Sequence, residues 1–170
     1  MTGAKRVVVV ALLVAAGGAA VVVRPVAAGD ADTDAQAVAV VLDRFHQAAA
    51  EADGAAYFAL FVDDAVFLGT DVTERWTLPE FRAFAEPYFA DGRGWTYTAT
   101  ERHVDVAPGG DTAWFDEVLW NDRYGTCRGT GVLLRTPVGW RIAQYHLTIP
   151  IPNELAAELT ARIREHDGRE

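Results

Sequence analysis

The chain has 170 residues, a formal net charge of −9 at pH 7 and 51 % hydrophobic residues. This length allows one domain with a full core, and this hydrophobic content excludes disorder throughout. The acidic balance argues against a surface that follows nucleic-acid phosphates and indicates a soluble, self-repelling surface. No serine occurs, which excludes a serine nucleophile, and the single cysteine, Cys127, excludes an internal disulfide.

Residues 1–28 have the layout of a secretory signal peptide. Two basic residues precede an uncharged run from Val7 to Val23, and Val26-Ala27-Ala28 matches the small-x-small cleavage rule. We expect cleavage after Ala28 and export of the mature chain to the periplasm or the medium. The alternative is a membrane anchor formed by residues 7–23. Residues 29–33 are a polar lead before the domain.

Three helices are predicted in the first half of the domain, which we place at residues 34–153. A capping box at residues 33–36 opens a helix that ends near residue 52, and Asp53 caps a short second helix. After a strand at residues 65–69, a second capping box at residues 77–80 opens a helix that Pro87 should kink or shorten. His46 borders the apolar face of the first helix and is interpreted as an edge residue rather than a ligand.

The second half of the domain changes to strand periodicity. Strands are predicted at residues 95–106, 112–120, 126–135 and 140–149, and the short turns between them indicate an antiparallel meander. Helices followed by strands predict an α+β domain whose helices pack on one face of the sheet. Glycines at positions 129 and 131 should let the sheet bend. Pro150 and Pro152 end the sheet, and residues 154–170 form a C-terminal helix and tail.

The last strand has two different faces. Side chains alternate along a strand, so one face carries Trp140, Ile142, Gln144, His146 and Thr148. This face changes from apolar to polar, which predicts a helix-covered start and a pocket further along. The opposite face is largely apolar, whereas an uncovered face should be polar. We therefore expect an isologous homodimer through the outer face, at Ala143, Tyr145 and Leu147.

Two adjacent acids, Asp116 and Glu117, lie in an otherwise apolar strand and point to opposite faces. One of them should therefore face a cavity or an interface. A carboxylate in an apolar site costs several kcal/mol or has a raised pKa unless it is paired. Arg128 on the next strand is an available partner, and a structural pair with either acid is as well supported as a catalytic acid.

The candidate catalytic residues are Asp116, with Glu117 as the alternative, as a base with a pKa raised by burial, and His146, as a proton shuttle. The expected ligand pocket combines polar groups and flat apolar walls: Asp71, Glu74, Trp76, Tyr97, Trp114, Glu117, Trp120, Arg128 and Gln144. This set suits proton transfer next to a carbonyl, in an isomerisation, cyclisation or dehydration of a small apolar compound. The alternatives are a non-catalytic ligand-binding or dimerisation domain, and for His146 a hydrogen-bonded core position.

No cofactor is expected. A metal site would need His103 and His146 to meet across strands, with Glu117 or Asp105 nearby, but no H-x-H, H-x-x-x-H or C-x-x-C spacing supports it. The glycine-rich segment "GTCRGTG" lies within a strand, so a phosphate-binding loop is not expected there.

Several phrases resemble the SnoaL-like branch of the nuclear transport factor 2-like superfamily: "GTDVTERW", "AWFDE", "GTCRGTGVLL" and "WRIAQYHLTIPIPN". The resemblance covers about residues 34–153. It implies a conical half-barrel, in which N-terminal helices pack on the concave face of a curved, mainly antiparallel sheet around a cavity, usually in a dimer. The superfamily includes ketosteroid isomerase, polyketide cyclases, dehydratases and association domains, so the fold does not decide the function. No motif here matches the catalytic residues of the isomerase.

Overall fold

The computed structural model describes residues 31–168. The predicted signal peptide, its cleavage site and the anchor alternative lie outside these residues. Between residues 31 and 168, no helix is both long and apolar enough to span a bilayer. The elements follow in the order α1 (Ala31–Ala50), α2 (Gly54–Phe58), β1 (Phe61–Leu68), β2 (Arg75–Thr77), α3 (Leu78–Ala90), β3 (Thr98–Val106), β4 (Thr112–Asn121), β5 (Gly125–Thr136), β6 (Gly139–Thr148) and α4 (Asn153–His166).

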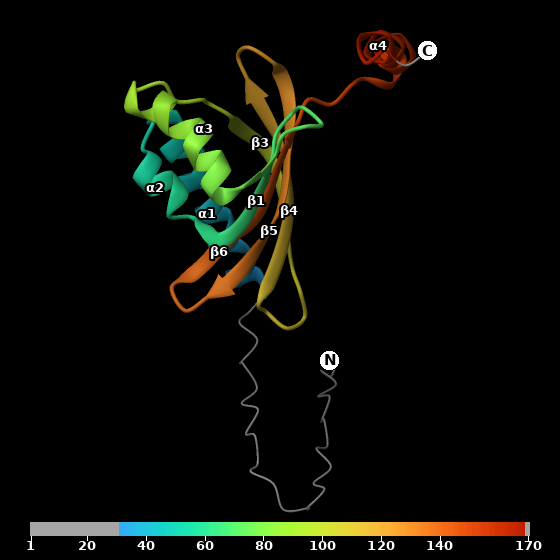
Figure 1. The fold of residues 1–170 in the computed structure, drawn as a ribbon. Helices are drawn as coiled ribbons and strands as arrows, with labels where there is room; N and C mark the ends of the chain where they lie inside the picture. Colours follow the sequence, from blue (N-terminus) through green and yellow to red (C-terminus); the bar gives the residue numbers. More distant parts are fainter. Residues whose placement is uncertain (1–30, 169–170) are drawn as a thin grey trace, which may run out of the picture.

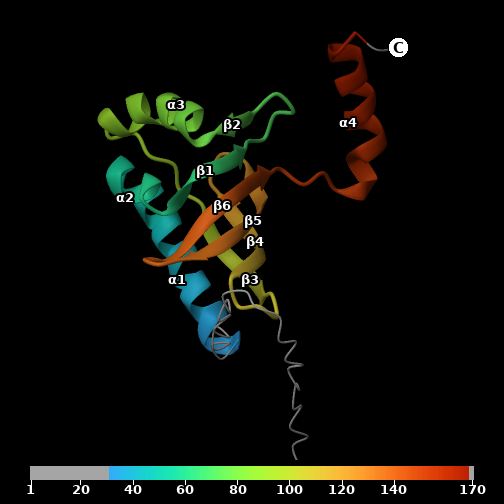
Figure 2. The same ribbon diagram turned by 60° about the horizontal axis from the view of Figure 1, so that its bottom comes forward.

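The strands form one curved sheet in the order β2-β1-β6-β5-β4-β3. The last four strands are the predicted antiparallel meander, while β1 runs parallel to β6 and pairs antiparallel with β2. Helices α1, α2 and α3 lie on one face of this sheet, and α4 stands apart beyond its end (Figures 1 and 2). The predicted α+β half-barrel is confirmed.

Local capping explains where two of the helices begin. Asp53 accepts a hydrogen bond from the backbone N–H of Ala56 at 2.9 Å, which caps α2 as predicted. The carboxylate of Glu80 accepts one from the N–H of Thr77 at 2.8 Å, so the second capping box fixes β2 directly against the start of α3. The capping box predicted at residues 33–36 is wrong, because α1 already includes Ala31 and Thr33 lies inside the helix.

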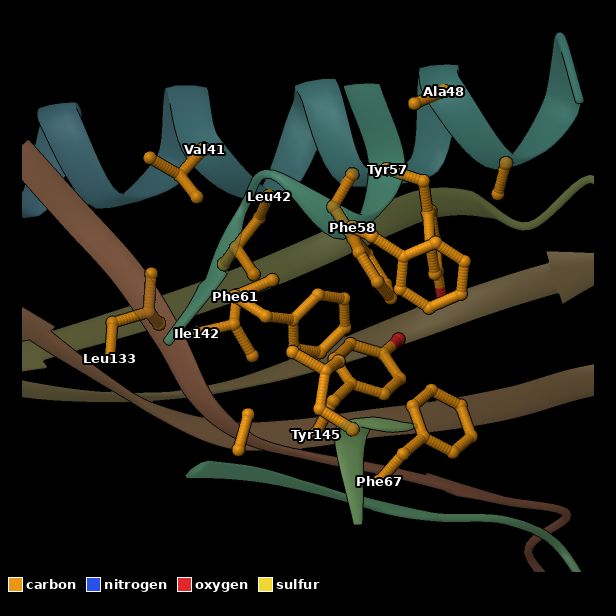
Figure 3. Close-up of a cluster of buried hydrophobic side chains, with 14 of the residues drawn as sticks. Val41, Leu42, Ala48, Tyr57, Phe58, Phe61, Phe67, Leu133, Ile142 and Tyr145 are labelled. Carbon is orange, nitrogen blue, oxygen red and sulfur yellow. The ribbon is translucent and has the colours of Figure 1, made fainter. Parts of the chain in front are cut away.

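Aromatic side chains fill the space between the helices and the concave face (Figure 3). Tyr57 of α2 stacks on Phe45 of α1 at 4.7 Å between ring centroids, and Tyr145 of β6 approaches Phe45 at 4.6 Å. Full burial of such a side chain contributes about 1.5–3 kcal/mol. These side chains therefore fill the space between α1, α2 and β6.

A β-bulge interrupts the pairing of β5 with β6. Leu133 pairs with Ile142, but its neighbour Val132 pairs with Gln144, so Ala143 is an extra residue in β6. The backbone approaches closely here: a Cβ on Gly131 would collide with the carbonyl oxygen of Gln144. Because side chains alternate, one extra residue moves every later side chain of the strand to the other face.

The bulge reverses the predicted faces of the second half of β6. Tyr145 is buried in the core cluster and Leu147 packs against it, so both belong to the concave face. Gln144 and His146, predicted to line the pocket, lie on the outer face instead. The expected outer interface at Ala143, Tyr145 and Leu147 needs the same correction, since two of its three residues point inward.

Candidate functional site

A cavity of about 660 Å³ opens where α3 and the loop after β1 diverge from the β4–β5 turn. This volume lies within the range of small-molecule pockets, roughly 300–1,000 Å³. Leu147 at the far end of β6 contributes to its wall, so the cavity lies on the concave face. The aromatic residues of its lining include Phe67, Trp76, Phe81, Trp95, Tyr97 and Trp120.

Trp76 of β2 is the centre of one wall of this cavity. Its ring stacks on Phe81 at 5.6 Å with an interplanar angle of 13°, and on Phe84 at 4.9 Å with an angle of 20°. The capping box places β2 at the entry of α3, which brings these side chains together. These three nearly parallel rings stack on one another with an offset and make an aromatic wall on which a further planar ring can stack.

Tyr97 provides a half-buried hydrogen-bond donor in the cavity. Among residues 31–168 its hydroxyl has no hydrogen-bond partner. Burial raises the pKa of Tyr97 to about 12, so the hydroxyl stays protonated at neutral pH. Two other polar groups of the lining are engaged: Asn121 donates to the carbonyl of Thr96 at 2.9 Å, and Glu74 accepts from a backbone N–H of the rim loop at 3.1 Å.

Next to the cavity, Glu117 of β4 forms a buried ionic cluster. Its side chain is 0 % exposed and accepts three hydrogen bonds, from His46 Nε2 at 2.7 Å, Arg102 Nε at 2.8 Å and the hydroxyl of Tyr145 at 3.1 Å. Arg102 also donates to Asp43 at 2.7 Å. Burial opposes ionisation of Glu117, but His46 and Arg102 outweigh it and hold its pKa below the usual value. An ionised carboxylate only accepts, so Nε2 of His46 carries a hydrogen.

Gly129 makes room for this cluster. A Cβ at this position would lie 2.8 Å from a carboxylate oxygen of Glu117 and would collide with the hydroxyl of Tyr145. The glycine predicted to bend the sheet is therefore required for the close approach of these two side chains. Glu117, Gly129 and Leu147 occupy one row across β4, β5 and β6, so the cluster borders the cavity without lining it.

The lowered pKa of Glu117 gives a pH dependence with a defined sign. The unfolded chain, with the higher pKa, binds this proton more readily, so the stabilisation is complete above about pH 4.3 and is lost as the pH falls through the folded value. We expect the acid-induced decrease in the free energy of unfolding to be shallower in Glu117→Gln than in the wild type, measured by urea denaturation across the acid range. Identical slopes in both proteins would contradict this account.

Four of the predicted pocket residues line the cavity: Glu74, Trp76, Tyr97 and Trp120. Asp71 does not line it. Its carboxylate accepts hydrogen bonds from the backbone and side chain of Thr73, which holds the pKa of Asp71 below its usual value and shapes the rim loop.

The remaining predicted residues, Glu117 apart, lie on the outer face. Asp116 of β4, Thr130 of β5 and His146 of β6 lie side by side in one row across the sheet. The two candidate catalytic residues, Asp116 and His146, therefore share the outer face, which does not meet the cavity. Trp114 of β4 and Gln144 of β6 lie in another row of the same face, on either side of Val132 of β5. Arg128 lies next to Thr148 of β6, also on this face.

All three partners of Glu117 were missed, and the bulge in β6 explains the contact with Tyr145. The predicted partner Arg128 is wrong, because it points to the opposite face. Arg102 lies directly across from Glu117 in the β3–β4 hairpin, and counting outward from the turn at residues 107–111 would have found it. His46 was interpreted as an edge residue, and only the packing of α1 against the sheet brings it to Glu117.

The structure does not bring together the residues that the metal-site alternative would need. His103 and His146 share one outer row, but β4 and β5 separate them, a distance of about 14 Å at the usual strand spacing. Glu117 lies on the other face. Within the described part of the chain, no three potential metal ligands gather.

Comparisons with solved structures agree with this architecture. An NTF2-like protein of unknown function from Pseudomonas putida has 18 % identity and a TM-score of 0.61, over 74 % of this chain and 93 % of that one. A proposed aromatic ring hydroxylase from Novosphingobium aromaticivorans has 20 % identity and a TM-score of 0.62, over 73 % and 94 %. A proposed dehydratase of the NTF2-like family from Streptomyces avermitilis has 22 % identity and a TM-score of 0.57, over 72 % and 100 %. At these identities the likeness shows the fold alone.

No protein of curated function matches the chain. The model of the SnoaL-like domain family matches residues 38–152, which is more than half of the chain and includes every strand and the helices α2 and α3. The chain therefore belongs to the family of SnoaL-like domains.

Proposed function

We propose that the cavity binds one small, flat and largely apolar molecule. The observation that carries this proposal is the wall formed by Trp76, Phe81 and Phe84, whose nearly parallel rings face a cavity large enough for a compound of several fused rings. Apolar walls with a few placed polar groups are the usual composition of ligand sites. Aromatic or polycyclic compounds are the chemical class that fits such a wall.

Tyr97 supports a more specific ligand. Tyr97 is half-buried, and a ligand that excludes water from its hydroxyl would need an oxygen there to accept the hydrogen bond. A carbonyl or hydroxyl group at one end of an otherwise apolar compound meets this requirement. An anionic ligand is less favoured, because two acids, Glu74 and Asp122, line the cavity against one cation, Arg123.

Replacing Tyr97 with phenylalanine tests this hydrogen bond. We expect the affinity for an apolar carbonyl compound to fall about fivefold, the equivalent of about 1 kcal/mol for one hydrogen bond. Titration followed by tryptophan fluorescence measures it, because Trp76, Trp95 and Trp120 line the cavity. Tyr57→Phe, a buried tyrosine outside the lining, should leave the affinity unchanged; equal losses in both variants would refute a role for the Tyr97 hydroxyl.

Acid–base chemistry of the isomerase, cyclase or dehydratase type is the second candidate. A histidine oriented by a carboxylate is a common arrangement for a general base, and the 2.7 Å contact of His46 with Glu117 provides it beside the hydroxyl of Tyr145. Two proteins with this fold are proposed to be a dehydratase and an aromatic ring hydroxylase. The binding function is favoured because none of these three residues lines the cavity. Turnover that His46→Gln abolishes without weakening ligand binding would reverse this order.

We also propose that the mature chain begins at Gly29 and is exported. The basic start, the uncharged run and the small residues before Gly29 support it. Intact-mass measurement of the protein from its own host should give a chain without residues 1–28. Full-length protein in the membrane fraction would favour the anchor at residues 7–23 instead.

A further inference from the structure

The C-terminal helix α4 (Asn153–His166) carries an apolar row that the described part of the chain, residues 31–168, leaves uncovered. Leu155, Leu159 and Ile163 follow at intervals of four residues, which places them on one side of the helix. None of the residues of α4 is buried, and Leu155 and Ile163 are 47 % and 50 % exposed. A helix of this length is marginal in water by itself, so its stability requires a surface that covers this row.

The chain leaves the sheet beside the cavity. Leu147 lines the cavity, and β6 ends one residue later at Thr148. The linker at residues 149–152 has no secondary structure, and its two prolines cannot continue the ladder of β6. Helix α4 starts directly after this linker and lies outside the SnoaL-like domain at residues 38–152. The helix is therefore an addition to the family domain, attached where the cavity is.

Large apolar side chains are exposed around the mouth of this cavity. Val72 of the rim loop, residues 69–74, is 98 % exposed. Across the mouth, Trp120 and Tyr124 at the β4–β5 turn are 50 % and 45 % exposed, and Phe84 of α3 is also exposed. Exposed apolar groups that gather in this way mark interaction sites. The mouth thus presents an apolar edge of the kind that the row on α4 requires.

The charge of His166 connects the end of α4 with the rim loop. His166 follows Ile163 by three residues and therefore lies on the side of the apolar row. Hydrogen bonds from Thr73 are the main cause of the lowered pKa of Asp71 in the rim loop, and the charge of protonated His166 adds to it. The loop between β1 and β2 and α4 both project beyond the same end of the sheet (Figures 1 and 2). The end of α4 is thus within electrostatic reach of the mouth.

The length of α4 and its linker allows the helix to cover the mouth. Helix α4 has 14 residues and spans about 21 Å, and the linker extends to at most about 14 Å. Rotation within the linker is therefore enough to bring the apolar row to a mouth that begins next to Leu147. A phospholipid surface fits the row less well, because membranes rich in anionic lipid repel a chain with a net charge of −9.

We propose that α4 is a lid that folds over the mouth of the cavity of its own chain and places its apolar row against the exposed rim and the bound ligand. The structure has this lid in its open position. The inference rests on the ligand-binding function and extends it: Leu159, at the middle of the row, contacts the outward side of the ligand and selects compounds that are apolar there. Closure also keeps water from the ligand and slows its dissociation.

Stopped-flow fluorescence with prodan, a neutral naphthyl ketone, tests the lid on the mature chain. Leu155→Asp with Ile163→Asp should speed the dissociation of prodan about tenfold, because charged side chains cannot pack on an apolar rim. Ala157→Asp with Ala161→Asp adds the same charges to the opposite side of α4, and we expect its dissociation rate to stay within about twofold of the wild type. Equal rates in the two double variants would overturn the lid and leave the binding proposal intact. No saturable binding of prodan by the wild type would contradict the binding proposal, and the lid with it.

The distance between two spin labels measures the closure itself. With labels at Ala83→Cys on α3 and Ala161→Cys on α4, saturating prodan should shorten this distance by about 10 Å, roughly half the length of α4. Cys127 is buried and stays unlabelled. A distance that prodan leaves unchanged would overturn the lid.

Two further outcomes would assign the apolar row to another surface. If a mixture of chains that each carry one label gives the same short distance, α4 covers the cavity of a second copy, and the lid on its own chain is overturned. Binding to phosphatidylglycerol vesicles that is lost in the Leu155/Ile163 variant would overturn the lid in favour of a membrane surface.

Discussion

Replacing Glu117 with glutamine should lower the free energy of unfolding by about 3–5 kcal/mol, the usual cost of breaking a buried ion pair from one side. Glutamine keeps the volume of the side chain, so the loss reports the charge and the hydrogen bonds rather than a cavity. Arg102 would keep only Asp43 as a charged partner, and His46 would lose its carboxylate. Urea denaturation at neutral pH measures the change.

The neighbouring acid is the matched control for this experiment. Asp116 points to the outer face and is exposed, so Asp116→Asn should change the free energy of unfolding by no more than about 0.5 kcal/mol. Alternation along β4 puts the two acids on opposite faces without saying which of them faces the core. A loss below about 1 kcal/mol for Glu117→Gln would mean that the cluster is not a source of stability.

Replacing Trp76 with alanine should weaken ligand binding about thirtyfold, equivalent to about 2 kcal/mol for a central aromatic contact. The indole of Trp76 stacks on both Phe81 and Phe84, so its removal takes away the ring that these two contacts share. The same change at Trp114 removes an equal side chain from the outer face. The affinity per subunit of Trp114→Ala should match the wild type.

Comparing the affinities of Trp76→Ala and Trp114→Ala is informative because the sequence predicted both tryptophans to line the pocket. If the outer-face variant loses as much affinity as the Trp76 variant, then the ligand does not bind in the cavity. Fluorescence titration with a polycyclic carbonyl compound measures both, and far-ultraviolet circular dichroism at the same temperature verifies that each variant is folded.

The fold was predictable because its signals are local. Alternating strands, short turns and a capping box before α3 each depend on a few neighbouring residues, and the structure confirms the predicted four-strand meander. The predicted start of α1 was wrong because a T-x-x-Q pattern also occurs inside helices. Nothing in the local sequence at Thr33 marks a helix boundary.

The faces of β6 were not predictable from alternation. One extra residue at Ala143 reverses the strand, and its signal in the sequence is indirect. Gly131 on the neighbouring strand permits the close approach of the Gln144 carbonyl, but a glycine in a strand indicates a bend or a bulge without saying on which strand the bulge occurs. The face of the sheet on which Tyr145 and His146 lie therefore could not be predicted from alternation alone.

Of the contacts in the ionic cluster around Glu117, one could be predicted from the sequence and two could not. The pairing of Arg102 with Glu117 follows from the register of one hairpin and could be counted from its turn. His46 reaches Glu117 from a helix 71 residues earlier in the chain, and the Tyr145 hydroxyl does so only because of the bulge. Contacts between distant segments depend on helix packing, which the periodicity of single segments does not contain.

Native mass spectrometry of the mature protein, purified from its own host, tests the central claim most directly. The binding proposal predicts one additional mass per subunit, belonging to an uncharged polycyclic or aromatic compound with a carbonyl or hydroxyl oxygen, and predicts its absence from Trp76→Ala. An unoccupied protein that also fails to bind such compounds saturably in titration would contradict a ligand-binding cavity.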